Sequence, residues 1–142
     1  VITGAASGIG RGLADRCAKE GMKVVLADIE ENALIQAEEE MKATGATVMS
    51  VITDVSKEGD VKSLAEKSVD AFGDVHLLFN NAGVGGGTSA WESTVADWEW
   101  IMGVNLWGVI HCVRTFVPIM LKQQSESHIV NTASMAGLMS GP

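Results

Sequence analysis

Short apolar runs alternate along this chain with longer stretches in which apolar residues recur every three or four positions. The apolar runs cover residues 1–3, 24–27, 48–52, 76–79 and 128–132. A fully apolar run is typical of a strand that is covered on both faces, and the periodic stretches are typical of helices with one buried face. Strands that alternate with helices form a parallel sheet, because each helix returns the chain to the starting end of the next strand. The pattern predicts an α/β fold with a parallel sheet between two layers of helices.

The order of the five strands follows from the handedness of their connections. Right-handed crossovers favour the order 3-2-1-4-5, a doubly wound, Rossmann-like sheet in a three-layer α/β/α arrangement. Ligands of such sheets bind beyond the carboxyl ends of the strands, where the loops after the first and fourth strands lie side by side. Residues 1–142 are expected to form a single domain that is truncated at both ends, since the chain opens within a strand and closes in a loop.

The helices are expected over residues 9–20, 34–41, 61–72 and 98–120. Ser56 precedes the third of them and is expected to cap its amino end. The apolar stripe of the fourth is interrupted near Gly103 and Gly108, and Pro118 predicts a kink.

A glycine-rich segment follows the first apolar run and opens the first helix. It reads Thr3-Gly4-Ala5-Ala6-Ser7-Gly8-Ile9-Gly10. Glycine permits positive φ and a close approach of the main chain to a ligand, and the free amides and dipole of the following helix favour a diphosphate. A tight turn without a ligand is the alternative, but the position between strand and helix in the first βα unit favours nucleotide binding.

Asp28 ends the second apolar run, 18 residues beyond Gly10. A carboxylate there can accept hydrogen bonds from the ribose hydroxyls of an adenosine, and it repels a 2′-phosphate. NADP sites usually supply Arg or Lys nearby, whereas this chain has Ser7 before Gly8 and Ile29 after Asp28. We therefore predict NAD as the cofactor; the alternative is that Asp28 caps the following helix.

The spacing of the three glycines resembles the T-G-x-x-x-G-x-G pattern of the short-chain dehydrogenase/reductase family, and further motifs follow in the family's order. These are Asp54-Val55, Asn80-Asn81-Ala82-Gly83, Val104-Asn105-Leu106 and Ser134. The resemblance implies a cofactor site made of Gly4, Ser7, Gly8, Ile9, Gly10, Asp28, Asp54, Val55, Asn81, Ala82, Gly83 and Val104. It also implies that Asn105 and Ser134 belong to the catalytic machinery.

By the same resemblance, Asp54-Val55 reads the adenine edge, Val104 contacts the adenine end and Asn81 lines the ribose. Asn105 maintains a distortion of its helix and holds a water of the proton relay, and Ser134 hydrogen-bonds the substrate oxygen. Without the resemblance, the aspartate is an ordinary loop residue, Asn105 a satisfied core amide and Ser134 a turn residue.

The family's Y-x-x-x-K motif is missing, and the sequence contains no tyrosine. In relatives this motif follows the serine after a short loop, so we expect it beyond Pro142 and expect these 142 residues alone to be inactive. For the whole protein the resemblance implies hydride transfer between NAD and the carbon of an alcohol or ketone. Two alternatives stay open: a non-catalytic dinucleotide sensor of the same fold, and a methyltransferase that uses S-adenosylmethionine.

Charge and composition bear on partners and location. The net charge of −8 argues against a nucleic-acid partner, and the three histidines lack the spacing of metal ligands. The chain has no run of 18 apolar residues and no secretory leader, and Cys17 and Cys112 are expected to be reduced and buried. We expect a cytoplasmic protein that binds no metal or membrane.

Family members usually pair through the helix at 98–120, and its excess of apolar residues predicts a homodimer or homotetramer.

Overall fold

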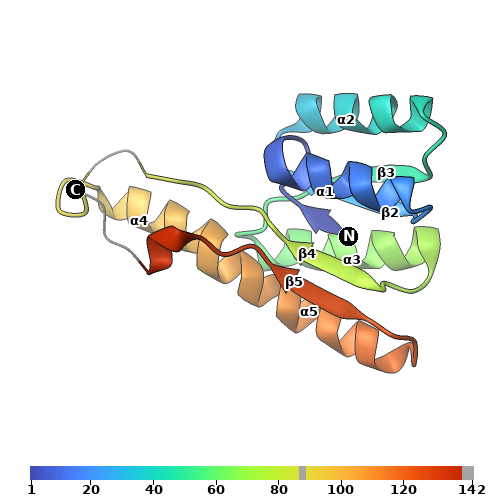
Figure 1. Ribbon diagram of the computed structural model, residues 1–142. Helices are drawn as coiled ribbons and strands as arrows, with labels where there is room; N and C mark the ends of the chain where they lie inside the picture. Colours follow the sequence, from blue (N-terminus) through green and yellow to red (C-terminus); the bar gives the residue numbers. More distant parts are fainter. Residues whose placement is uncertain (87–88, 139–142) are drawn as a thin grey trace.

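The computed structural model describes residues 1–86 and 89–138 of the chain. Within these residues five parallel strands form one sheet in the order β3-β2-β1-β4-β5 (Figure 1), which confirms the predicted fold class and strand order. The strands are β1 (Ile2–Thr3), β2 (Val24–Asp28), β3 (Val48–Ile52), β4 (Leu77–Asn80) and β5 (His128–Asn131). β1 lies in the middle, where Ile2 pairs with Leu26 of β2 and with Phe79 of β4.

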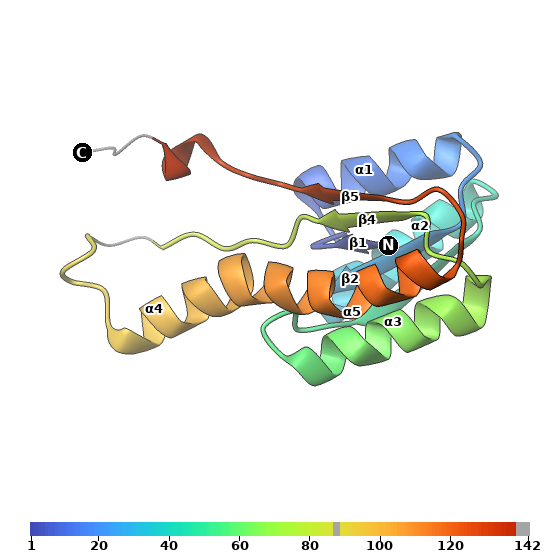
Figure 2. The same ribbon diagram turned by 90° about the horizontal axis from the view of Figure 1, so that it is seen from below.

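Helices cover both faces of the sheet (Figure 2). One layer holds α1 (Gly8–Lys19) and α2 (Glu31–Ala43), and the other holds α3 (Glu58–Phe72) and α5 (Gly108–Lys122). α4 (Val95–Met102) and a short π-helix, η1 (Gly103–Trp107), precede α5, and a 3₁₀ turn, η2 (Met135–Gly137), follows β5.

The two layers are held by alternate side chains of the strands, because successive residues of a strand point to opposite faces. In β2, Val24 and Leu26 pack into the core cluster of α1 and α2, whereas Val25 and Ala27 pack into the cluster of α3 and α5. All of them are at most 3% exposed. A Val or Leu side chain buried this fully contributes about 1.5–3 kcal/mol to folding. The continuous apolar run at 24–27 is thus explained by burial on both faces.

α3 does not start as predicted. It begins at Glu58 with Lys57 at the N-cap position, so the expectation that Ser56 caps it is wrong. The Ser56 hydroxyl donates instead to Asp54 Oδ1 at 2.6 Å. The acidic residues Glu58 and Asp60 in the first turn interact favourably with the helix dipole.

The predicted helix at 98–120 is a continuous helical stretch over residues 95–122. Its interruption near Gly103 and Gly108 is confirmed, since the five residues from Gly103 form the π-helix η1; α5 continues through Pro118. An 18-residue window of this stretch has a mean hydropathy of 1.4, so the stretch could cross a membrane by length and composition, which the absence of an 18-residue apolar run did not suggest. Core helices of soluble proteins pass the same test, and α5 buries Cys112 and Phe116 against the sheet.

Three segments extend together past one end of the sheet (Figure 1). They are α4, the loop that leads to it from β4, and the chain that follows β5. The loop and the chain after β5 both leave from the carboxyl ends of their strands, so this is the end of a parallel sheet at which ligands bind.

Candidate functional site

A cavity of about 610 Å³ opens at the carboxyl ends of the strands. Its walls come from the segments that follow β1, β2, β3 and β4, together with residues of α4 and η1. Every residue that was predicted to bind the cofactor lines this cavity: Gly4, Ser7, Gly8, Ile9, Gly10, Asp28, Asp54, Val55, Asn81, Ala82, Gly83 and Val104. Residues that are up to 100 positions apart in the sequence are thereby brought into one site.

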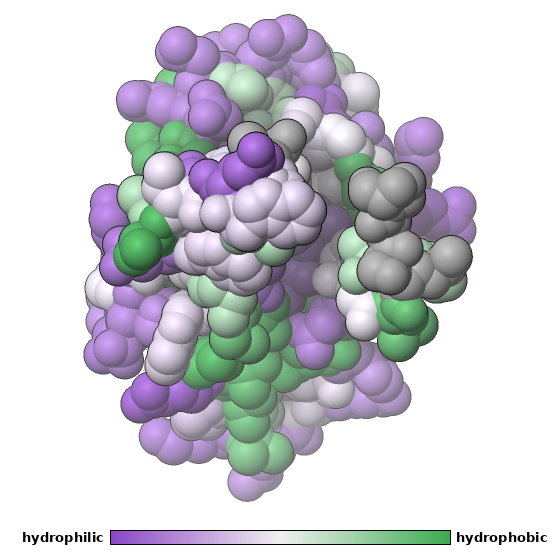
Figure 3. Space-filling view, turned by 90° about the vertical axis from the view of Figure 1, so that its left-hand side faces the viewer, coloured by the Kyte–Doolittle hydropathy of each residue, from purple (hydrophilic) through white to green (hydrophobic). Residues whose placement is uncertain are grey.

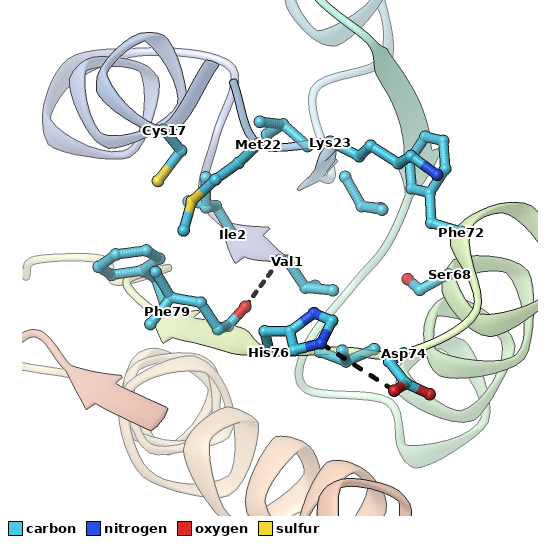
Figure 4. Close-up of a pocket in the computed structure, with 14 residues that line it drawn as sticks. Val1, Ile2, Cys17, Met22, Lys23, Ser68, Phe72, Asp74, His76 and Phe79 are labelled. Atoms are coloured by element: carbon cyan, nitrogen blue, oxygen red, sulfur yellow. Dashed lines mark hydrogen bonds and ion pairs between the residues drawn. The ribbon is translucent and has the colours of Figure 1, made fainter. Parts of the chain in front are cut away.

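A second cavity, of about 330 Å³, lies at the opposite end of the sheet (Figure 4). Its walls are mostly apolar, and Cys17, Phe72 and Phe79 are among its lining residues. The Val1 nitrogen donates to the Leu77 carbonyl at 2.8 Å. None of the residues singled out for cofactor binding or catalysis lines this cavity, so the candidate site is the larger one.

The glycine-rich segment forms the floor of the candidate site. Gly4 and Gly8 have φ of +65° and +54°, a region that L side chains rarely adopt. A Cβ atom at Gly10 would lie 1.9 Å from the Gly4 carbonyl oxygen, and one at Gly4 would lie 2.9 Å from Ala82 Cα. At Gly10, α1 is therefore pressed against the segment that follows β1, and neither Gly4 nor Gly10 has room for a side chain. Because Ser7, Gly8 and Ile9 line the cavity, the amino end of α1 opens onto it.

Asp28 joins the end of β2 to the glycine-rich segment. Its Oδ2 accepts the Ala6 amide at 2.9 Å, and its Oδ1 accepts the Glu30 amide at 3.1 Å. The N-cap residue of α2 is Glu30, so Asp28 supports the start of this helix from outside it. The carboxylate lines the cavity in a fixed orientation, with lone pairs left for further donors.

Asp54 stands at the exit of β3, in the turn that leads to α3. Its Oδ1 accepts the amide and the hydroxyl of Ser56 at 3.0 and 2.6 Å, and its Oδ2 lies 3.2 Å from the Lys57 ammonium. Partial burial opposes ionisation, but these hydrogen bonds outweigh it and hold the pKa of Asp54 below its usual value. The residue therefore presents a negative charge to the cavity at neutral pH.

The asparagines after β4 connect three strand ends. Asn81 Nδ2 donates to the Thr3 carbonyl at 3.1 Å, and Asn81 Oδ1 accepts the Thr132 hydroxyl at 3.1 Å. Thr3 Oγ1 accepts the amides of Asn81 and Ala82, each at 3.0 Å. Asn80 Nδ2 donates to Asn131 Oδ1 at 2.8 Å. These contacts set the shape of the cavity wall between β1 and β4.

Thr3 and Thr132 were not predicted as site residues. Thr3 belongs to the T-G pattern, but only the glycines of that pattern suggested a role in binding. No motif around Thr132 indicates that this residue contacts Asn81. The hydroxyl groups of both threonines form hydrogen bonds with Asn81 and so support the cavity wall.

Asn105 lies in the π-helix η1 and clamps the loop after β4. Its Nδ2 donates to the Val84 carbonyl at 2.8 Å, and its Oδ1 accepts the Val84 amide at 2.8 Å. The side chain thus satisfies both polar groups of one peptide residue, 21 positions earlier in the chain. The distorted helix and the loop after Gly83 are held together at the mouth of the cavity.

Ser134 follows β5 and is exposed. It forms the N-cap of η2, where its hydroxyl oxygen accepts the Ala136 amide at 3.2 Å. Neither Ser134 nor Asn105 lines the cavity, whereas Thr132, two residues before the serine, does. In the loop between β4 and α4, residues 87 and 88 lie outside the described residues. No cluster of metal-ligating side chains is present among the residues that the structure describes.

The model of the short chain dehydrogenase family matches residues 1–142. The chain belongs to this family. Short-chain dehydrogenases are oxidoreductases, and the chain shares their nucleotide-binding, Rossmann-type sheet. A crystal structure of a short chain dehydrogenase/reductase from Burkholderia phymatum, in complex with NAD, is 56% identical with a TM-score of 0.97, and the match covers 99% of this chain and 50% of that one.

Two curated dehydrogenases are also similar to the chain, at lower identity. A CLA biosynthesis dehydrogenase/reductase of Lactiplantibacillus plantarum is 40% identical over 141 residues, which are 99% of this chain and 49% of the relative. A 1-deoxy-11-beta-hydroxypentalenate dehydrogenase of Streptomyces avermitilis is 40% identical over 143 residues, 99% of this chain and 53% of that protein. The chain thus spans about half the length of the relatives it matches. Because these relatives are dehydrogenases, the methyltransferase and sensor alternatives are not favoured.

Proposed function

We propose that residues 1–142 form the dinucleotide-binding domain of an NAD-dependent dehydrogenase that transfers a hydride between the nicotinamide and an alcohol or ketone. The observation that carries the proposal is the cavity at the carboxyl ends of the strands. It combines a glycine floor at the amino end of α1 with a fixed carboxylate, Asp28, at the end of the neighbouring strand. A diphosphate fits the first feature and a ribose diol fits the second.

The charges of the cavity support NAD over NADP. Asp28, Glu30 and Asp54 line it, and no Lys or Arg is found among its described lining residues. Arg11, the cation next to the glycine-rich segment, is held by Asp15 at 3.0 Å and by Glu40 at 3.1 Å. Two unit charges 4 Å apart interact by about 4 kcal/mol at an effective dielectric near 20. If repulsion between Asp28 and a 2′-phosphate reaches even a third of that energy, NAD binds roughly tenfold more tightly than NADP. The Burkholderia relative was solved with NAD.

We propose that residues of this chain contribute to catalysis by positioning the substrate and the backbone around it. The bound dinucleotide supplies the nicotinamide ring that accepts or gives the hydride. Ser134 would hold the substrate oxygen by donating its hydroxyl hydrogen to it, since the contact with the Ala136 amide uses only the serine oxygen as an acceptor. Asn105, which holds the loop after β4, would keep the backbone near the reacting groups in place and support a water of the proton relay.

The remaining proposals concern the whole protein. Its substrate would be a small alcohol or carbonyl compound, it would act in the cytoplasm, and it would be a homodimer or homotetramer. The support for association is an apolar patch, formed by Trp98, Met102 and Leu106, whose side chains are 41–47% exposed. Viewed from the end at which α4 projects, hydrophobic side chains form a band along this helical stretch (Figure 3).

The test of the cofactor proposal compares Asp28→Ala with the wild type. Calorimetric titration of the whole protein should give tighter binding of NAD than of NADP, and Asp28→Ala should reduce that preference by at least tenfold. Arg11→Ala serves as the control, because its side chain is bound to α1 and α2 and should not affect the preference. Tighter binding of NADP, or an unchanged preference in Asp28→Ala, would contradict the proposal.

A further inference from the structure

Trp100 of α4 lines the candidate cofactor cavity although no motif assigns it a role. Its side chain is 52% exposed, so the indole is accessible to a ligand in the cavity. The other three tryptophans do not line the cavity: Trp91 is the most exposed, Trp98 Nε1 donates to the Ala90 carbonyl at 3.4 Å, and the Trp107 ring lies 5.9 Å from that of His111. Trp100 is therefore placed differently from the rest.

The position of Trp100 along the cavity is fixed by its helix. Val104, four residues later, also lines the cavity, so one stripe of the helical stretch faces it. The next part of this stretch lies directly against the turn after β3, where a Cβ atom at Gly103 would be 3.3 Å from Ser56 Cβ and one at Gly108 would be 2.7 Å from a Val55 methyl group. Trp100 consequently shares the cavity wall with the turn after β3.

This wall is far from the proposed reaction centre. β3 is at one edge of the sheet and β5, which leads to Ser134, is at the other. A dinucleotide whose diphosphate rests at the amino end of α1 and whose ribose reaches Asp28 at the end of β2 directs its base towards β3. The base, rather than the nicotinamide, is the part of the ligand that Trp100 can reach.

The Trp100 indole and the adenine base have complementary surfaces. The polar groups nearest to this wall, those of Asp54 and Ser56, already bond to one another and to Lys57, so they leave the faces of a bound purine uncovered. An indole offers an uncharged aromatic surface, and contact of a base with an aromatic side chain typically changes affinity by about tenfold. We infer that Trp100 forms the outer wall of the base subsite, where its indole packs against the adenine of the bound dinucleotide. This inference rests on the proposed function.

Calorimetry with three ligands tests it on the whole protein: NAD, ADP-ribose, which contains the adenosine, and nicotinamide mononucleotide, which does not. Trp100→Ala should weaken binding of NAD and of ADP-ribose by about tenfold and leave binding of the mononucleotide unchanged. Trp100→Phe keeps an aromatic ring and should lose less than Trp100→Ala. The matched control is Trp107→Ala, a tryptophan of similar exposure (49%) outside the cavity, which should bind all three ligands as the wild type does.

Two further readouts separate contact from indirect effects. ADP-ribose should quench the tryptophan fluorescence of the wild type and of Trp107→Ala, and this quenching should be lost in Trp100→Phe. In steady-state assays Trp100→Ala should raise the KM for NAD with little change in kcat, because the contact is made equally in the ground and transition states.

Several outcomes would overturn the inference. Wild-type affinity of Trp100→Ala for ADP-ribose would show that the indole does not contact the base. Equal losses for ADP-ribose and the mononucleotide would show a general disturbance of the site, and dissociation of an oligomer would place Trp100 in a subunit interface. In each of these cases NAD still binds the wild type, so the proposed function stands. If the wild type binds neither NAD nor ADP-ribose, the proposed function itself is wrong.

Discussion

Gly10 and Gly12, both near the amino end of α1, have opposite surroundings, and this contrast explains why only one of them shapes the site. The Cβ position of Gly10 collides with the Gly4 carbonyl, whereas that of Gly12 meets open space. Both lie inside α1, and a glycine inside a helix makes the helix less stable than an alanine would. The glycine at position 10 is thus required by packing and the glycine at position 12 is not.

Alanine substitutions at these two positions should therefore have opposite effects. Gly10→Ala should destabilise the domain and abolish NAD binding, because the glycine-rich segment must move away from α1 to admit the methyl group. Gly12→Ala should stabilise it by about 0.5–1 kcal/mol, the usual gain from removing glycine in a helix. Thermal unfolding with and without NAD measures both. Wild-type NAD affinity in Gly10→Ala would contradict the assignment of this segment as the cofactor's floor.

Single residues were predictable where a local pattern carries their role. Gly4 and Asp28 follow from their places at strand ends and Gly10 from the glycine spacing, and the structure brings all three into one cavity. Thr3 and Trp100 could not be predicted in the same way. Their places depend on how strands and helices that are distant in the sequence pack together.

At the scale of whole elements, the strands were the most predictable part. Their apolar runs are continuous because the helices bury both faces, and the handedness of crossovers then sets the order. The start of α3 was not predictable, because the Ser56 hydroxyl could bond either to the first amides of the helix or to Asp54. In the turn that the chain forms, it donates to Asp54. The two glycines signalled the break in the long helix, but the π-helix between them also involves the contact of Asn105 with Val84, 21 residues away.

The packing of α5 on the sheet can be followed through its cysteine. Cys112 is 1% exposed, and burial raises the pKa of its thiol to about 12. The thiolate is the reactive form, so iodoacetamide at pH 8 should not modify Cys112 in the folded protein. Cys17, which is only partly buried, should react first, although burial also raises the pKa of its thiol. Mass spectrometry of the alkylated protein distinguishes the two sites.

Unfolding provides the control for this prediction. In guanidinium chloride both cysteines should be modified at similar rates, because the pKa of Cys112 returns towards its ordinary value of 9.0. Since the folded-state pKa is the higher one, the thiol favours the folded state below pH 9, and this contribution is lost as the pH rises towards 12. Rapid modification of Cys112 in the folded protein would show that α5 does not pack on the sheet as described.

At the scale of the whole molecule, the helical stretch 95–122 is covered unevenly. Only 22% of its most apolar window is buried, although α5 contributes Cys112, Phe116 and Met120 to the core. The uncovered side includes the patch of Trp98, Met102 and Leu106. A protein with a net charge of −8 and such an exposed apolar patch is expected to cover it with a second copy, since an isologous contact brings the same residues of both copies together.

Met102→Glu tests this association directly. Two copies of the substituted face would bring like charges together in an apolar interface, so the whole protein should change from a dimer or tetramer to a smaller species, with at least a hundredfold weaker association. Light scattering coupled to size-exclusion chromatography measures the mass. Ile35→Glu is the matched control, because Ile35 is 44% exposed on α2 in the opposite helix layer and should leave the mass unchanged. A monomeric wild type, or an unchanged mass in Met102→Glu, would show that this patch does not join the subunits.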